Sequence, residues 1–176
     1  MQTLPMKLIT ALAFTTALLL QGCGWHLRGS QPLPAELQTL SLETANKNSE
    51  FTRSLKRSLK SLDVTLVETL ADAPYQLQVS DIKESKRALS ITSNARVAEY
   101  EITSTLNFSV NGKEGAQLQP STMLSTERTY LYNSNNATSA FEEEKLLRKE
   151  MQRDLIQQII RRYRAIQPSA TESENN

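Results

Sequence analysis

The sequence contains very few of the residues that most often build disulfides and metal sites. Its 176 residues include one cysteine, Cys23, and one histidine, His26. A single cysteine cannot form an internal disulfide, so the fold must depend on its hydrophobic core. The usual zinc ligands are too few for a zinc site, and we predict no metal. The sequence also lacks a phosphate-binding loop, a nucleophile elbow and a dinucleotide fingerprint, so we predict that the protein is not an enzyme.

The chain also lacks an excess of charge of either sign. It carries 20 Lys and Arg against 19 Asp and Glu, and Lys7 is the only charged residue before Cys23. Removal of the first 22 residues would therefore leave 19 charges of each sign. Non-specific nucleic-acid binding requires surplus positive charge, so a nucleic-acid partner is not expected.

One apolar run, Leu8 to Leu20, follows Lys7. It is too short to span a bilayer comfortably, which takes roughly 20 apolar residues. A basic residue, a short apolar segment and a small residue are typical of a secretory signal peptide, so we expect residues 1–22 to be removed. A free cysteine after an ordinary signal peptide is one interpretation of Cys23.

The segment Leu20-Gln21-Gly22-Cys23 resembles the lipobox of bacterial lipoproteins. In that class the cysteine thiol receives a diacylglycerol and the new amino terminus is acylated, so the resemblance implies covalent lipid on Cys23 and no other cofactor. Gln21 departs from the usual Ala, Ser or Thr. Several acyl chains make a lasting membrane anchor, whereas one binds only marginally. Gly24, in place of the Asp that retains such proteins at the inner membrane, implies the outer membrane.

Composition divides the mature chain into three parts. Residues 23–36 contain Pro32 and Pro34, which favour an extended strap behind the lipidated cysteine. Residues 37–166 form a single predicted domain, and residues 167–176 form a polar tail that we expect to be disordered. Trp25, two residues after Cys23, is expected either at the lipid headgroup level or packed on the domain.

We predict an α+β fold: a mixed or antiparallel sheet of about four strands, with two helices packed on one face. Val97 to Val110 is the clearest strand, because apolar and polar side chains alternate along its whole length. Asn111-Gly112 is a strong turn dipeptide. Lys83 to Arg87 is predicted as a charged hairpin tip or a frayed strand end. Strand patterns occur in residues 37–44, 64–68, 75–80, 97–110 and 122–132.

The first helix is predicted from an N-cap at Asn48 or Ser49, with one apolar stripe. It also carries a basic face, expected to be either solvated or in contact with phosphates or another anionic surface. This face consists of Arg53, Lys56, Arg57 and Lys60. The last helix is predicted to start with a capping box of Ser139 and Glu142 and to end before Pro168. Acidic residues 142–144 would then occupy its first turn, and Arg161, Arg162 and Arg164 its last.

Four further segments are informative: Cys23-Gly-Trp-His-Leu-Arg28, Ala98-Glu99-Tyr100, the strand from Arg128 to Tyr132, and Lys149-Glu150-Met151. In these segments the chain resembles the LptE family of lipopolysaccharide-assembly lipoproteins. The resemblance implies an outer-membrane lipoprotein, anchored on the periplasmic side, that plugs the large β-barrel LptD. It also implies lipopolysaccharide binding by basic residues, for which the candidates are Lys86, Arg87, Arg96 and Arg128.

Two other interpretations compete with this one. The runner-up is a lipid-anchored periplasmic adaptor that binds another envelope protein through its exposed strands and carries no lipid. Co-purification with a large outer-membrane barrel would separate the two. An enzyme is the third interpretation, and a screen for hydrolase activity would test it.

Overall fold

The computed structural model describes residues 33–113 and 116–167. The predicted signal peptide, Cys23, Trp25 and the polar tail from residue 168 onward lie outside the described residues. Only residues 33–36 of the predicted strap are described, and they lead into a short 3-10 turn, Ala35–Leu37. No helix among the described residues is both long and apolar enough to span a membrane.

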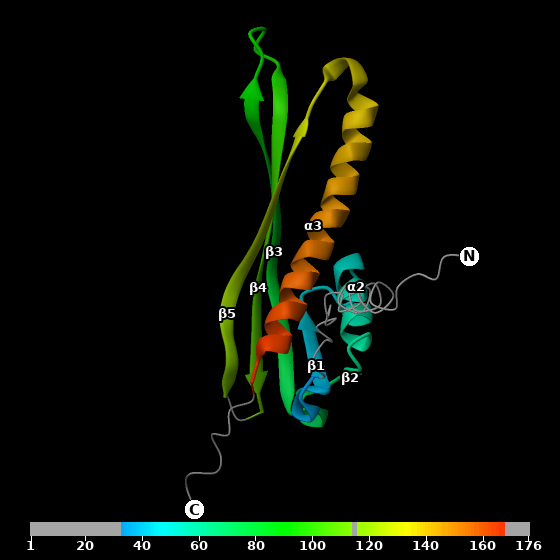
Figure 1. Ribbon diagram of the computed structural model, residues 1–176, viewed down its shortest axis with the longest axis vertical. Coiled ribbons are helices and arrows are strands. Elements are labelled where there is room, and N and C mark those ends of the chain that lie inside the picture. Colours follow the sequence, from blue (N-terminus) through cyan, green and yellow to red (C-terminus); the bar gives the residue numbers. More distant parts are fainter. Residues whose placement is uncertain (1–32, 114–115, 168–176) are drawn as a thin grey trace, which may run out of the picture. The chain divides into compact units, whose positions relative to one another are not determined.

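The predicted α+β class is confirmed, with a five-stranded sheet in place of about four strands (Figure 1). The strand order is β2-β1-β3-β4-β5. β1 pairs in parallel with both of its neighbours, whereas β3, β4 and β5 form an antiparallel meander. The strands are β1 (Thr39–Thr44), β2 (Thr65–Val67), β3 (Tyr75–Ile91), β4 (Val97–Gly112) and β5 (Gln117–Leu131).

β3 is much longer than the predicted segment 75–80, and Lys83 to Arg87 is neither a hairpin tip nor a frayed end. After a bulge at Asp81, where φ is 50°, β3 pairs with β4 again from Lys83 onward. Polar residues on both sides of this stretch hide the strand from a hydrophobic pattern. The hairpin turn instead covers residues 92–96, where the Thr92 amide donates to the Arg96 carbonyl over 2.7 Å.

The connection between β4 and β5 also differs from the prediction. Asn111-Gly112 forms the last part of β4 rather than the turn, and the Gly112 amide donates to the Ala116 carbonyl over 2.7 Å. Asn111 pairs with Gln117, so β5 starts five residues before the predicted Thr122. Cross-strand pairing with β4 extends both strands past the point at which apolar alternation ends.

The first helix, α2 (Glu50–Lys60), begins as predicted. The Ser49 hydroxyl accepts a hydrogen bond from the Thr52 amide over 3.0 Å, which satisfies one free donor of the first turn. The apolar stripe of α2 turns inward and buries Phe51, Leu55 and Leu59.

The predicted start of the last helix is wrong. α3 (Ala137–Ala165) begins two residues before Ser139, with Asn136 as its N-cap, and its first turn contains no acidic residue. A 3-10 turn, Ser134–Asn136, leads directly into α3, and the Ser139 hydroxyl donates to the Asn136 side chain over 2.9 Å. Arg162 and Arg164 do lie in the last turn, as expected. Pro168, the predicted terminator, lies outside the described residues.

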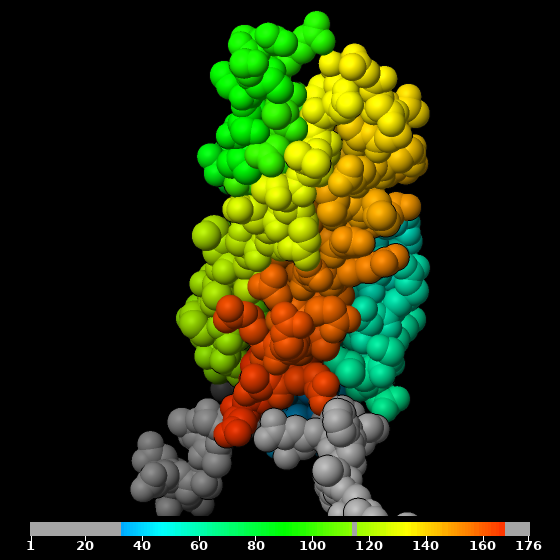
Figure 2. All heavy atoms as spheres, turned by 45° about the horizontal axis from the view of Figure 1, so that its top comes forward, coloured from blue at the N-terminus to red at the C-terminus, as the bar shows by residue number. Residues whose placement is uncertain are grey.

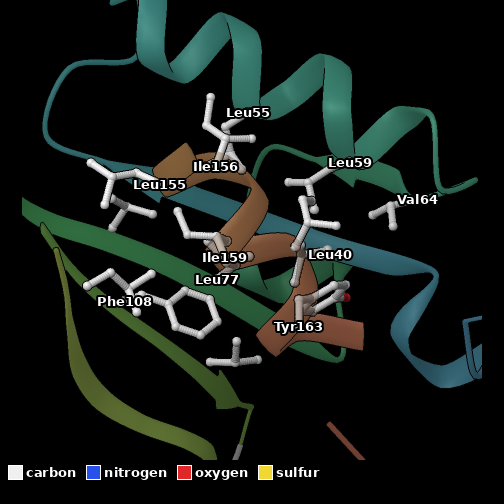
Figure 3. Close-up of a cluster of buried hydrophobic side chains, with 14 of the residues drawn as sticks. Leu40, Leu55, Leu59, Val64, Leu77, Phe108, Leu155, Ile156, Ile159 and Tyr163 are labelled. Atoms are coloured by element: carbon white, nitrogen blue, oxygen red, sulfur yellow. The ribbon is translucent and has the colours of Figure 1, made fainter. Parts of the chain in front are cut away.

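α2 and α3 cover the same face of the sheet, and the core lies between these helices and the sheet (Figures 1 and 3). α3 runs beside the long strands, and α2 packs against α3 over β1 and β2. The side chains that meet there come from every layer and are 3% exposed or less: Leu40, Leu55, Leu59, Leu77, Phe108, Leu155, Ile156, Ile159 and Tyr163.

One buried polar contact ties the two ends of the described chain together. The Tyr163 hydroxyl near the end of α3 donates to the Leu37 carbonyl over 2.6 Å. Tyr163 is fully buried, and burial raises the pKa of its hydroxyl, so the group stays protonated and keeps donating.

We expect Tyr163→Phe to lower the free energy of unfolding by about 1–2 kcal/mol, because the Leu37 carbonyl would lose its partner inside the core. Urea titration followed by circular dichroism would measure the change. Tyr132→Phe is the matched control, since Tyr132 is only half-buried, and it should alter stability by less than about 0.5 kcal/mol. Equal losses in the two variants would contradict a specific role for the buried bond.

Candidate functional site

Within residues 33–113 and 116–167, the sheet has one face covered by α2 and α3 and one open face. Because successive side chains of a strand point to opposite faces, the residues of β4 that do not point to the helices share the open face. Strand register then places the polar side chains of β3 and β5 beside them. The central part of this open face contains Ser85, Arg87, Glu99, Glu101, Thr103, Thr105, Ser125, Glu127 and Thr129.

A bidentate ion pair lies on the open face. The Arg87 guanidinium donates Nε to Glu101 Oε1 and Nη2 to Glu101 Oε2, the latter over 2.9 Å. Glu101 is only 5% exposed, and the hydrogen bonds from Arg87 hold the pKa of its carboxyl group below the usual value. Arg87, one of the predicted lipid contacts, therefore already forms an ion pair with a carboxylate of its own sheet.

A polar network occupies the covered face at the hairpin end, where the apolar core thins out. Its centre is Glu144 of α3. Lys86 Nζ and the Tyr130 hydroxyl both donate to Glu144 Oε2 over 2.5 Å, and Arg148 donates Nε and Nη2 to Oε1 over 3.1 and 2.8 Å. Arg148 Nη1 also donates to Glu84 of β3. We call Lys86, Tyr130, Glu144 and Arg148 the Glu144 cluster.

The hydrogen bonds explain the protonation state of Glu144. Partial burial alone would raise the pKa of its carboxyl group, but the bonds from Lys86, Tyr130 and Arg148 outweigh burial and lower the pKa to about 2. Lys86 also lies 4.1 Å from the centre of the Tyr100 ring, which adds a cation–π contact. The cluster therefore joins α3 to β3 through an ion pair and to β5 through the Tyr130 hydroxyl.

The four candidate basic residues do not form one site. Lys86 and Arg128 point to the covered face, where Lys86 pairs with Glu144 and Arg128 Nη2 pairs with Asp154 of α3. Arg87 is on the open face. Arg96 lies in the hairpin turn, where its guanidinium donates to the Ser134 hydroxyl over 3.4 Å. Three of the four candidates, Lys86, Arg87 and Arg128, are thus already paired with a carboxylate of the chain.

Glu144 was missed in the sequence, where residues 142–144 were expected to serve only the helix dipole. Its partners are 58 residues away in β3 and 14 residues away in β5. A helical wheel gives a partial signal, because Glu144, Leu147, Arg148 and Met151 recur at spacings of three and four and so share one face of α3. Within residues 33–113 and 116–167, no group of three His, Cys, Asp or Glu side chains could hold a metal ion.

Comparison with solved structures defines the class of protein. The fold matches the solution structure of an uncharacterized lipoprotein B from Nitrosomonas europaea, with a TM-score of 0.69 at 23% identity over 81% of this chain and 92% of that chain. It also matches crystal structures of the rare lipoprotein B from Shewanella oneidensis (TM-score 0.63, 26% identity, 70% of this chain and 91% of that chain) and a minor lipoprotein from Acinetobacter baumannii (0.61, 26%, 76% and 94%). The architecture is thus that of a group of bacterial lipoproteins.

Comparison of sequences names the family. The model of the family described as LptE, lipopolysaccharide-assembly, matches residues 37–163, from β1 to the last turn of α3. The LPS-assembly lipoprotein LptE of Pectobacterium atrosepticum is 32% identical over 165 residues, which cover 93% of this chain and 88% of that protein. The same protein of Photorhabdus laumondii is 27% identical over 173 residues, 96% and 93% of the two chains. The chain belongs to the LptE lipopolysaccharide-assembly family.

The Glu144 cluster makes the free energy of unfolding depend on pH in the acidic range. Because folding lowers the pKa of Glu144, its contribution is complete above about pH 4.5 and is lost as the pH falls through about 2. We expect Glu144→Gln to lower the free energy of unfolding at pH 7 by about 1–2 kcal/mol, a value discounted for solvent screening. The variant should also lose less stability than the parent chain between pH 4.5 and 2.

Chemical denaturation at a series of pH values would measure this difference. Glu142→Gln is the matched control, because Glu142 is exposed on the same helix and pairs only loosely with Lys145, at 3.6 Å. If Glu144→Gln and Glu142→Gln gave superimposable pH profiles, the stabilising role of the cluster would be wrong.

Proposed function

We propose that this chain is a lipid-anchored outer-membrane subunit that sits inside an LptD-like β-barrel and binds lipopolysaccharide during its assembly. The observation that carries the proposal is the family match over residues 37–163, which includes every long strand and both helices. The open face of the sheet supports it independently. Barrel interiors are polar and wet, and a plug there needs a polar surface rather than an apolar one.

The partner contact is proposed for the open face. Serine, threonine and paired charged side chains can exchange hydrogen bonds with a polar lumen without leaving an isolated charge dehydrated. The ion pair between Arg87 and Glu101 fits this role, because it presents a neutral unit. A periplasmic adaptor would use the same face for another protein, so the identity of the partner distinguishes the two functions.

The first experiment is a pull-down through a carboxyl-terminal tag from detergent-solubilised outer membranes. We expect one large β-barrel to co-purify at a ratio of about one to one, because a plug is enclosed by a single barrel. The tag alone, expressed with the same signal peptide, is the control. Recovery of a different envelope protein in place of a barrel would favour the adaptor and overturn the plug.

Membrane attachment is proposed to occur through Cys23. Acyl chains on this cysteine would hold the mature chain at the outer membrane, on its periplasmic side. We expect Cys23→Ala to abolish the lipid-dependent mass increase of the purified protein and to release it from washed membranes. Mass spectrometry and membrane fractionation would check this, and a Cys23→Ala protein that stays membrane-bound without its barrel would contradict the anchor.

Lipopolysaccharide contact is proposed for the hairpin end. Arg96 is the one residue of the four candidates for which the described ion pairs show no acidic partner. Exposed apolar side chains lie on the strands beside it, notably Ile91 and Leu131 at 68% and 70% exposure. A cation next to apolar side chains suits a ligand that joins phosphates to acyl chains.

We expect Arg96→Glu to weaken lipopolysaccharide binding several-fold while leaving the unfolding midpoint unchanged, because Arg96 is exposed in a turn. Lys47→Glu, an equal charge reversal in the loop before α2, should leave binding unchanged. Immobilised lipopolysaccharide and surface plasmon resonance would measure both. An Arg96→Glu chain with the affinity of the parent would remove Arg96 from the proposed contact.

A further inference from the structure

Basic side chains from α2 and α3 line a groove between the two helices, and the proposed function gives them no role. Two adjoining hollows, of about 370 and 170 Å³, share Ser54, Arg57, Arg153 and Ile156 in their linings and so form one continuous groove. Ser58 lines the larger hollow and Lys149 the smaller. α2 (cyan) and α3 (orange to red) lie side by side on this surface (Figures 1 and 2).

Helical spacing brings these residues together from both walls. Arg57 and Ser58 lie three and four residues after Ser54 along α2, and Lys149 and Arg153 are four apart on α3. Ile156 is 3% exposed and forms an apolar floor between the helices, whereas Arg57 and Arg153 are both exposed. The groove thus has cationic walls, hydroxyl groups on one side and a carbon floor.

The basic side chains of the groove form no ion pair with the carboxylates that the structure describes. None of the ion pairs among the described residues includes Arg57, Lys149 or Arg153. Arg57 Nη2 donates to the Ser54 hydroxyl over 2.9 Å, which holds the guanidinium at the wall of the groove. Glu50 lines the smaller hollow, and the larger hollow has no acidic lining residue. Like charges facing one another across a groove are unfavourable until an anion joins them.

We propose that the α2–α3 groove binds the phosphate of an anionic phospholipid headgroup. Two guanidinium groups from opposite walls can each donate two parallel hydrogen bonds to phosphate oxygens, and serine hydroxyls can donate further ones. The volume exceeds that of a bare phosphate, and Ile156 offers a surface for the carbon atoms of a glycerol headgroup. The choice of a lipid rests on the proposed function in one respect, namely that an anchor at Cys23 keeps the chain beside a surface dense in phosphate.

The groove is separate from the proposed lipopolysaccharide contact. Its basic residues lie on α2 and in the middle of α3, whereas Arg96 lies in the turn between β3 and β4. A second, weaker contact with the membrane would limit the directions in which an anchored domain can point. Such a contact adds to the anchor through local concentration rather than through high affinity of its own.

The test uses the full mature chain purified in maltoside micelles, which contain no phosphate. Phosphatidylglycerol is added to the micelles in steps. Nuclear magnetic resonance follows the amide signals of Ser54 and Ser58 and the side-chain amide of Gln157, which also lines the larger hollow. We expect saturable shifts that weaken as salt increases. Phosphatidylcholine, whose headgroup carries no net charge, should produce no saturable shift.

Matched variants assign the binding to the groove. Arg57→Gln with Arg153→Gln should raise the dissociation constant roughly tenfold or more, because charge-assisted bonds from both walls are lost. Lys47→Gln with Lys83→Gln removes the same charge elsewhere and should change it less than about twofold. Both variants should keep the unfolding midpoint of the parent, because the four substituted side chains are exposed.

Three results would overturn the proposal. The first is the absence of shifts with phosphatidylglycerol, and the second is an equal weakening in both double variants, which would indicate diffuse attraction to the micelle. The third is equal affinity for inorganic phosphate, which would make the groove a site for a free ion. None of these results depends on the barrel or on acylation, so failure of the groove and failure of the proposed function remain distinguishable.

Discussion

The placement of both α2 and α3 on one face of the sheet is the constraint on which the rest of the structure depends. α3 has 29 residues and is therefore about 44 Å long, enough to follow the long strands over most of their length. α2 fills the remaining space over β1 and β2. With α2 and α3 on the same face, no described element covers the opposite face. Its side chains must be stable against a polar environment, which explains the serine, threonine and paired charges along β4.

The same constraint divides the covered face into two regions with different chemistry. Where two helices overlie the sheet, the space is filled by leucine, isoleucine and Phe108. Where α3 alone overlies it, the small apolar cluster around Ile102 and Met151 is supplemented by the bonds to Glu144. Apolar packing is non-directional, whereas hydrogen bonds to a carboxylate fix positions. The hairpin end therefore has a defined geometry despite its thin core.

Sequence reasoning succeeded where one periodicity dominated. The alternation from Val97 to Val110 identified β4, and the stripe of Phe51, Leu55 and Leu59 identified α2 with its cap. It failed where pairing or context decided the structure. The stretch of β3 from Lys83 to Arg87 is polar on both faces, so only its register with β4 makes it a strand. The start of α3 was misplaced because Ser139 with Glu142 imitates a capping box, although Asn136 and the preceding 3-10 turn already start the helix.

The candidate site was predictable in residue type but not in arrangement. Basic residues near the long strands could be selected from the sequence, yet their carboxylate partners come from distant segments. Arg87 meets Glu101 from 14 residues away, Arg128 meets Asp154 from 26, and Lys86 meets Glu144 from 58. These pairs follow from strand register and from the path of α3 across the sheet, and neither is encoded in local spacing. The α2–α3 groove shows the same limit, since the basic face of α2 was visible and its counterpart on α3 was not.

The position of β1 has a consequence for how the chain acquires its structure. β1 is the first strand along the sequence, yet it lies between β2 and β3, and both of its neighbours follow it. The Leu37 carbonyl just before β1 accepts a hydrogen bond from the Tyr163 hydroxyl, which lies 126 residues later in the chain. Contacts of such long sequence separation slow folding, because the chain must close large loops before they form. A chain that emerges amino terminus first would therefore expose β1 without partners until β2 and β3 have emerged, and would expose the apolar face of the sheet until α3 is complete. This interval is when the protein most needs protection from aggregation.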